Sequence, residues 1–196
     1  MAEIRLERIQ RQIVDIDVVG VSPLIPHNWS EKARRMLREA QGGTIVKRAR
    51  EPKIAEDEAE AALYRLEDGR PGMPATAFKA AIIGAVRMFQ GITLVQTKSA
   101  MFVRGEGRDQ LVPIEGEMSM REDMPRNANG NVDLRYRYAF WPWRAALRVE
   151  YIAAMLDASS VVALVDAAGD GGIGDWRPSA PKSHTGTFGR FCVEGQ

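Results

Sequence analysis

Apolar and polar residues alternate over several short runs of this chain, and turns rich in glycine and proline separate these runs. Residues 13–25 are rich in Val and Ile and end at Pro23 and Pro26, which predicts a first core strand. The run Thr187–Val193 predicts the last strand. Both should be buried on at least one face, because β-branched side chains pack well on a pleated surface.

Three segments show helical spacing instead. The clearest is Met73–Phe89, where Thr76 is the expected N-cap and the predicted core face consists of Phe78, Ile82, Ala85, Val86 and Phe89. A short helix is expected from an N-cap at Ser30 to about Ala40, before Gly42 and Gly43. Another should begin near Asp157 or Ser159 and stop at Gly169.

Further strands are predicted between these helices. Residues 62–66 form a short strand before a turn at 68–72, and Thr93–Val103 reads as a strand that makes a hairpin with residues 111–114. The tip of this hairpin, Arg104–Arg108, is cationic. The aromatic segment 132–151 predicts either two strands divided at Pro142 or one bent strand.

The order strand, helix, strand, strand, helix, strand predicts an α+β fold with a ferredoxin-like (RRM-like) β-α-β-β-α-β core. We expect a single domain over residues 1–196, because 196 residues suffice for one core with large loops. The insertions would lie at about 28–60 and, as a hairpin, at about 93–131.

Composition and charge narrow the class of protein. The chain has 27 Lys and Arg against 26 Asp and Glu, a net charge of +1, so any binding of nucleic acid must come from local patches. No apolar run is long enough to span a membrane and the first residues lack a signal peptide's apolar region, so we expect a cytoplasmic protein with no membrane partner. The single cysteine, Cys192, fits a reducing compartment and is expected in the core.

A glycine-rich stretch over residues 169–191 carries the most informative side chains. Glycines let backbone N–H groups approach a ligand, and the interleaved cations and aromatic ring suit phosphates and stacked bases. The stretch also matches G-x-G-x-x-G, but it follows a predicted helix and opens none, which argues against a dinucleotide-binding site. The competing interpretation is a loop that only turns the chain before the last strand.

The sequence gives little support for catalysis. His27 and His184 are its two histidines, and with one cysteine they do not make a convincing metal site. Cys192 lies in an apolar strand, where a thiol is normally inert. We therefore expect no catalytic residue, no metal and no cofactor.

Two further surfaces are candidate ligand contacts. The segment from residue 31 to 53 is locally cationic, although a charge run of this kind usually forms a solvated face. The aromatic segment 132–151 also contains arginines at 135, 137, 144 and 148. This segment could present an aromatic and basic surface, but aromatic residues in strands mostly pack a sheet.

Two segments together resemble the RAMP superfamily, the repeat-associated proteins of CRISPR effector complexes. The run 73–87, Met-Pro-Ala-Thr-Ala-Phe-Lys onward, resembles the start of that family's first helix. Residues 171–178, Gly-Gly-Ile-Gly-Asp-Trp-Arg-Pro, followed by Gly-Thr-Phe-Gly-Arg-Phe at 186–191, resemble its glycine-rich loop and closing strand. The likeness covers about half the chain and is greatest to the Cas-seven-like backbone subunits that polymerise along a guide RNA.

The resemblance implies a groove for the sugar-phosphate backbone of RNA. It implies contacts from the first helix, from the glycine-rich loop and from inserted finger and thumb elements, here residues 28–60 and 104–108. The implied nucleic-acid contacts are Lys79, Arg87, Gly172, Gly174, Trp176, Arg177, Lys182, His184, Arg190, Arg104, Arg34 and Arg35. Such contacts are physically reasonable, because backbone binding needs cations and free N–H groups rather than base-specific side chains.

The leading hypothesis is a non-enzymatic subunit that binds RNA or another single-stranded nucleic acid. It would assemble with copies of itself or with related effector subunits into a ribonucleoprotein. The alternative is an assembly or regulatory protein of the same fold, including a phage-encoded one, that acts through protein–protein contacts. An endonuclease that processes repeat RNA is a third hypothesis, and it would need His27 or His184 near the bound phosphate.

Overall fold

A computed structural model describes residues 7–29, 31–43, 54–125, 130, 132–181 and 184–195, with the backbone alone for residues 31–33. The strands are β1 (Arg11–Gly20), β2 (Tyr64–Arg65), β3 (Pro71–Pro74), β4 (Met101–Arg104), β5 (Leu111–Pro113), β6 (Glu115–Asp123), β7 (Arg135–Ile152) and β8 (Phe191–Val193). The helices are α1 (Glu31–Gln41), α2 (Ala55–Ala61), α3 (Ala75–Ala85), α4 (Leu94–Ala100) and α5 (Ala158–Gly171), with a 3-10 turn, η1 (Val86–Met88).

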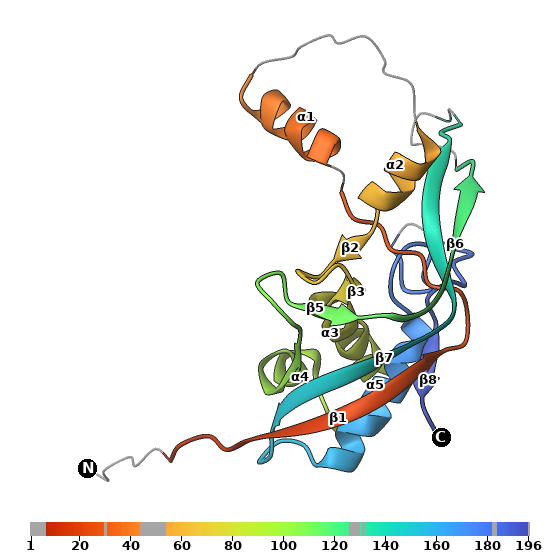
Figure 1. The fold of residues 1–196 in the computed structure, drawn as a ribbon. Coiled ribbons are helices and arrows are strands. Elements are labelled where there is room, and N and C mark those ends of the chain that lie inside the picture. The colour runs from red at the N-terminus through yellow and green to blue at the C-terminus, as the bar shows by residue number, and fades with distance from the viewer. Residues whose placement is uncertain are drawn as a thin grey trace.

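The long strand β7 organises the main sheet. Its C-terminal half lies between β1 and β4, while its N-terminal half pairs with β6, so that β6 and β7 form a two-stranded ribbon that rises from the sheet (Figure 1). The strand order is β4-β7-β1-β8, and every neighbouring pair is antiparallel. The protein therefore has an α+β fold with antiparallel sheets, as the sequence predicts at this level.

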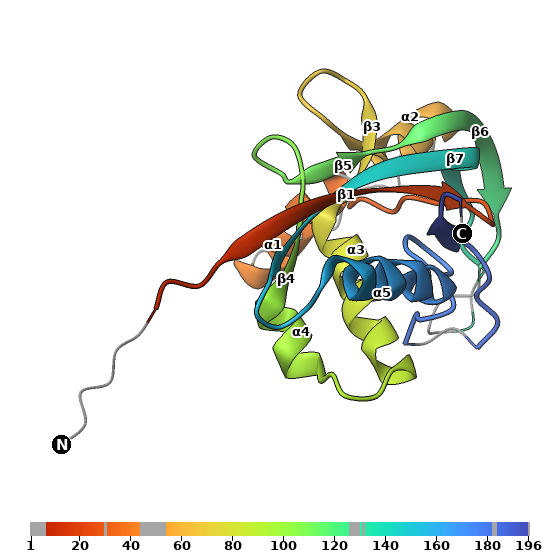
Figure 2. The ribbon, with the colours of Figure 1, turned by 90° about the horizontal axis from the view of Figure 1, so that it is seen from below.

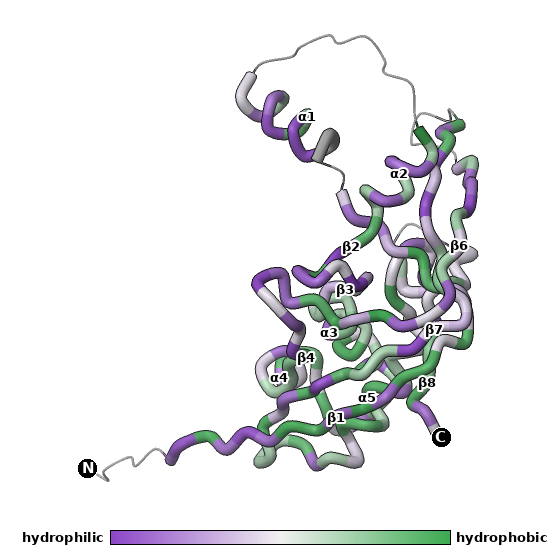
Figure 3. The backbone as a smooth tube through the Cα atoms, viewed as in Figure 1, coloured by the Kyte–Doolittle hydropathy of each residue, from purple (hydrophilic) through white to green (hydrophobic). Residues whose placement is uncertain are grey.

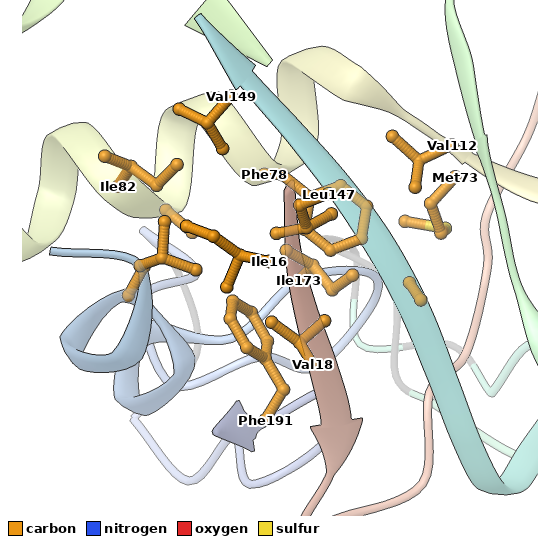
Figure 4. Packing of buried hydrophobic residues seen from close by; sticks show 14 of the residues in the cluster. Ile16, Val18, Met73, Phe78, Ile82, Val112, Leu147, Val149, Ile173 and Phe191 are labelled. Atoms are coloured by element: carbon orange, nitrogen blue, oxygen red, sulfur yellow. The ribbon is translucent and has the colours of Figure 1, made fainter. Parts of the chain in front are cut away.

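Helices α3 and α5 lie against one face of this sheet (Figure 2). Between them and the strands lies the core, in which Ile16 and Val18 of β1 and Leu147 of β7 meet Phe78 of α3 (Figure 4). Phe78 also packs edge to face on Phe191 of β8, with ring centroids 6.0 Å apart. Burial of these large side chains supplies the main driving force for the fold, since each contributes about 1.5–3 kcal/mol.

A small second sheet, in the order β2-β3-β5, leads directly into α3. Helix α1 is predominantly hydrophilic (Figure 3), and the described side chains Arg34 and Arg35 on it are exposed. No helix in the described part of the chain is both long enough and apolar enough to cross a bilayer.

Several predicted elements occur close to where the sequence places them. Helix α1 ends one residue beyond the predicted Ala40, although its expected cap, Ser30, lies outside the described residues. Helix α5 begins after Asp157, whose carboxylate accepts a hydrogen bond from the Ser160 N–H, and it runs two residues past Gly169. Segment 132–151 contributes one continuous strand, β7, rather than two.

The start of α3 differs from the prediction. Met73 belongs to β3, the N-cap is Pro74 rather than Thr76, and no side-chain hydrogen bond caps the helix. The predicted core face is correct except for Phe89, which follows η1 and is 38% exposed. Strand β1 also ends earlier than predicted, at Gly20, and Leu24 forms a separate bridge with Phe140.

The predicted strand Thr93–Val103 is wrong over most of its length. Residues 94–100 form α4, because Thr93 and Gln96 make a reciprocal capping box, and only Met101–Arg104 is a strand. The predicted hairpin is also wrong, since β4 pairs with β7 and β5 pairs with β3. A single bridge between Glu106 and Leu111 closes the turn that separates them.

Candidate nucleic-acid interface

A groove of ≈ 560 Å³ runs between α3 and the loop that follows α5. Its walls come from parts of the chain that are distant in sequence: residues 27–29 after β1, Tyr64 of β2, residues 73–87, and residues 172–179. The sequence-based prediction paired the helical segment Met73–Phe89 with the glycine-rich loop. The structure places these two segments against the same cavity.

Two arginines line the groove from different walls. Arg87 is exposed in η1, at the C-terminal end of α3. Arg177 lies on the loop, where its Nη1 donates a hydrogen bond to the Gly174 carbonyl at 2.9 Å. This bond holds the guanidinium in place with a single N–H, so that its other donors remain for a ligand.

Small residues line the α3 side of the groove. Ala77, Ala80, Ala81 and Gly84 lie among the lining residues, and nothing occupies the space where a Cβ of Gly84 would stand. Side chains this short let an extended ligand come close to the helix backbone. Cations next to a wall of small side chains suit the phosphates of an extended chain better than they suit a compact, enclosed substrate.

The glycines of the loop are explained by packing within the protein. Gly172 and Gly174 have positive φ values of 67° and 76°. A Cβ at Gly174 would lie 2.7 Å from the Ile25 carbonyl oxygen, and one at Gly172 would lie 3.0 Å from that of Phe188. These glycines therefore hold the loop tightly against neighbouring backbone, and their predicted approach to RNA remains a prediction.

A chain of charged side chains fixes the loop to the β6–β7 ribbon. Arg137 of β7 is 2% exposed and pairs with Asp175 of the loop and with Asp123 of β6. Arg121 forms a forked pair with Asp123, and His27 Nδ1 lies 3.0 Å from Asp175 Oδ2. Arg137 is thus buried and cannot belong to the exposed basic surface considered from the sequence, whereas Arg144 and Arg148 of the same segment are exposed.

The electrostatics of Asp175 follow from these contacts. Burial raises the pKa of its carboxyl, but the hydrogen bond with His27 and the positive charge of Arg137 outweigh that effect and lower the pKa to about 2. Asp175 is therefore a carboxylate at neutral pH. Its negative charge is directed at Arg137 and His27, which limits the repulsion it exerts on an anion in the groove.

Trp176 takes part in the same assembly. Its ring packs on Phe188, with centroids 5.8 Å apart, and the Arg137 guanidinium carbon lies 4.5 Å from its ring centroid. Arg121 approaches both rings, at 5.4 Å from Trp176 and 4.9 Å from Phe188. Protein groups thus already surround the ring that the resemblance implied as a nucleic-acid contact.

Three other predicted contacts lie outside the groove lining. Lys79 points to α4 and β4, where its Nζ donates to the Lys98 carbonyl at 3.0 Å and lies over the Phe102 ring, and burial lowers its pKa. Arg190 pairs with Asp170 at 2.7 Å. Arg104 pairs with Glu150 across β4 and β7.

The remaining predicted residues belong to less enclosed parts of the chain. Arg34 donates to the Asn28 side chain at 2.8 Å, which brings α1 near the groove segment 27–29. Arg35 and His184 are exposed. Lys182 lies outside the described residues.

Sequence reasoning missed three groove residues. Trp29, Tyr64 and Asp175 line the cavity, and none of them was a predicted contact, although Asp175 belongs to the glycine-rich loop. His27, considered in the sequence only for metal binding or cleavage, lies beside them. The sequence around Pro23 and Pro26 did not indicate that residues 27–29 turn toward α3. Residues 27 and 28 are held in place by hydrogen bonds with residues 62–64, which are distant in sequence.

No cluster of three or more His, Cys, Asp or Glu side chains in the described residues is arranged to hold a metal ion. Cys192 is partly exposed on β8 rather than fully buried in the core. Arg87 and Arg177 give the groove hydrogen-bond donors and positive charge.

No protein-family model matches this chain, and no curated protein matches it either. Among solved structures, it is similar to a chain in the cryo-EM structure of the Type III-B Cmr-beta bound to cognate target RNA. The two are 10% identical, with a TM-score of 0.48 over 94% of this chain. This chain spans 59% of the length of that one.

Proposed function

We propose that this protein is a non-enzymatic, RAMP-like subunit that binds single-stranded RNA by its sugar-phosphate backbone. The RNA would lie in the groove between α3 and the loop after α5. The observation that carries this proposal is the placement of Arg87 and Arg177 on two walls of one groove, beside a wall of alanines and glycine. Charge-assisted hydrogen bonds from arginine suit phosphate oxygens, and they require no particular base sequence.

The arrangement of the elements supports the same proposal. Along the chain β1, α3, β4, β7, α5 and β8 follow one another, and the sheet order is β4-β7-β1-β8. We interpret this as a ferredoxin-like β-α-β-β-α-β core, the architecture that RRM domains share. The described parts of segments 21–64 and 105–134, together with α4, are then additions to that core. Arg34 of α1 bonds to the Asn28 side chain, next to the groove residues His27 and Trp29.

Binding to a labelled single-stranded RNA at low salt tests the proposal, with fluorescence anisotropy as the readout. Arg87→Ala and Arg177→Ala should each weaken binding about tenfold, the effect of losing about 1.4 kcal/mol from one charged contact. Arg70→Ala is the matched control, because Arg70 pairs with Asp68 and Glu106 outside the groove. A flat titration of the unaltered protein would refute RNA binding.

Assembly with other copies or related subunits is the second part of the proposal. The protein purified with its nucleic acid should absorb strongly at 260 nm and elute as an oligomer whose size falls after nuclease treatment. An oligomer that stays intact and free of nucleic acid would instead favour the protein-binding alternative.

A specific observation keeps that alternative open. Strand β6 pairs with β7 on one side, and its first six residues are exposed. Met118 and Met120 on this strand are 40% and 45% exposed, and Met124 just beyond it is 67% exposed. An assembly or regulatory protein of the same fold, cellular or phage-encoded, could bind a partner along this edge.

Because His27 lines the groove, the endonuclease hypothesis predicts that His27 takes part in cleavage. An end-labelled RNA incubated with the protein should remain intact under the main proposal. Cleavage that disappears in the His27→Ala variant would overturn the non-enzymatic assignment and assign His27 to the reaction.

A further inference from the structure

Trp29 is a large aromatic side chain that lines the groove and yet is 56% exposed. Apolar rings of this size usually bury most of their surface in a folded protein. Tyr64 and His27 also line the groove, so its lining combines aromatic side chains with the cations Arg87 and Arg177.

The backbone that carries Trp29 is firmly held. The Asn28 N–H donates to the Ala62 carbonyl at 2.8 Å, and the Asn28 side-chain amide donates to the Leu63 carbonyl at 3.1 Å. The Tyr64 hydroxyl donates to the His27 carbonyl at 3.0 Å. Because the residues on its N-terminal side are fixed in this way, little backbone freedom is lost when a ligand packs on the ring.

The other tryptophans do not offer such a surface in the groove. Trp143 is 3% exposed, and its indole N–H donates to the Ser22 carbonyl. Trp176 packs against Phe188 and Arg137. Trp141 is 48% exposed, but it lies on β7 and is not part of the groove lining.

We propose that Trp29 is the stacking platform for one unpaired nucleobase of the bound strand. This inference rests on the proposed function and adds to it a base-binding subsite beside the phosphate contacts. The neighbouring His27 ring is held by Asp175 through Nδ1, and its Nε2 has no protein partner among the described residues, so it is available to the edge of the same base or to its phosphate.

The subsite predicts which class of nucleic acid the groove prefers. A base can stack on Trp29 only when it is free of its complementary strand, so the groove should prefer single strands to duplexes of equal charge. Stacking on an aromatic side chain is tolerant of sequence, because every base has a π face. The preference should therefore be for unpaired bases in general.

Two labelled strands of equal length and charge test this, an oligouridylate and an abasic analogue that keeps the sugar-phosphate backbone. The unaltered protein should bind the oligouridylate about tenfold more tightly, which is the order of one base–aromatic contact. Trp29→Ala should abolish this preference while leaving the affinity for the abasic strand unchanged, and Trp29→Phe should retain most of it. Trp141→Ala is the control for an exposed tryptophan outside the groove, and it should change neither affinity.

The outcomes separate the subsite from the groove itself. Equal binding of both strands by the unaltered protein would overturn the stacking subsite and leave phosphate binding intact. So would a preference that survives in Trp29→Ala. Loss of abasic-strand binding in Trp29→Ala would show a structural role for this residue and would also overturn the inference, whereas failure of both strands to bind would refute the proposed function as well.

Discussion

Arg137 pairs with Asp175, although 38 residues separate them in sequence. Through this contact the β6–β7 ribbon holds the loop that forms one wall of the groove. The same guanidinium reaches Asp123 at 3.1 Å, so three separate parts of the chain meet at one buried cation. The groove's shape therefore depends on a cation, Arg137, that is buried and does not itself line the groove.

Replacing this cation should strongly destabilise the protein. Arg137→Met leaves Asp123 and Asp175 without their shared partner, and breaking a buried pair in this way costs about 3–5 kcal/mol. Urea denaturation followed by circular dichroism measures the change. Arg144→Ala provides the control, since Arg144 and its partner Glu115 are both about two-thirds exposed, and it should change stability little. Equal stability of the two variants would show that Arg137 is not a structural clamp.

Acidification should weaken the same contact. The Asp175 pKa lies at about 2, below its ordinary value of 3.8, so the folded protein binds fewer protons than the unfolded chain between these values. The stability that Asp175 contributes is thus complete above 3.8 and is lost as the pH falls through about 2. Thermal unfolding across this window should show a steeper decline for the unaltered protein than for Asp175→Asn. Parallel declines would contradict the assigned role of this carboxylate.

The loop glycines can be tested against a glycine with similar backbone geometry. Gly174 and Gly69 both have positive φ, 76° and 87°, but only Gly174 has backbone within contact of a Cβ. Gly69→Ala should cost about 1–2 kcal/mol from the left-handed conformation alone. Gly174→Ala adds a clash with Ile25 and should cost more, and it should also weaken RNA binding. Similar unfolding free energies for the two variants would refute the close packing.

The observed cap of α4 can be compared with the cap that the sequence predicts for α3. Thr93 caps α4 through a reciprocal bond with Gln96, so Thr93→Ala should cost about 1 kcal/mol. Thr76, the cap expected from the sequence, makes no capping bond at α3, and Thr76→Ala should leave the unfolding free energy nearly unchanged. A larger loss in Thr76→Ala than in Thr93→Ala would contradict the observed helix starts.

These two threonines also show where sequence reasoning succeeds and fails. The core face of α3 could be predicted because Phe78 and Ile82 recur at helical spacing, and burial follows from that spacing. Thr93 and Gln96 have the spacing of a capping box, which the prediction of a strand over Thr93–Val103 overlooked. Pairing of β4 with β7 rather than with its neighbour β5 is a long-range choice that no local pattern encodes.

For the groove, the sequence indicated two of the segments that line it but not which side chains meet there. Arg87 and Arg177 line the cavity, whereas Lys79 points to α4 and Arg190 pairs with Asp170. The direction of the Lys79 side chain depends on its partner, the Lys98 carbonyl, which lies 19 residues away in sequence. The position of Trp29 in the groove could not be predicted for the same reason, because residues 62–64 hold the backbone before it in place.

The salt dependence of RNA binding tests the central claim most directly. A single strand whose phosphates contact Arg87 and Arg177 releases counterions, so the logarithm of the affinity should fall linearly with the logarithm of the salt concentration. The double variant Arg87→Ala with Arg177→Ala should bind more weakly and with a slope shallower by about 1.4, the value for two lost phosphate contacts on a single strand. A slope identical to that of the unaltered protein would place the bound phosphates outside this groove.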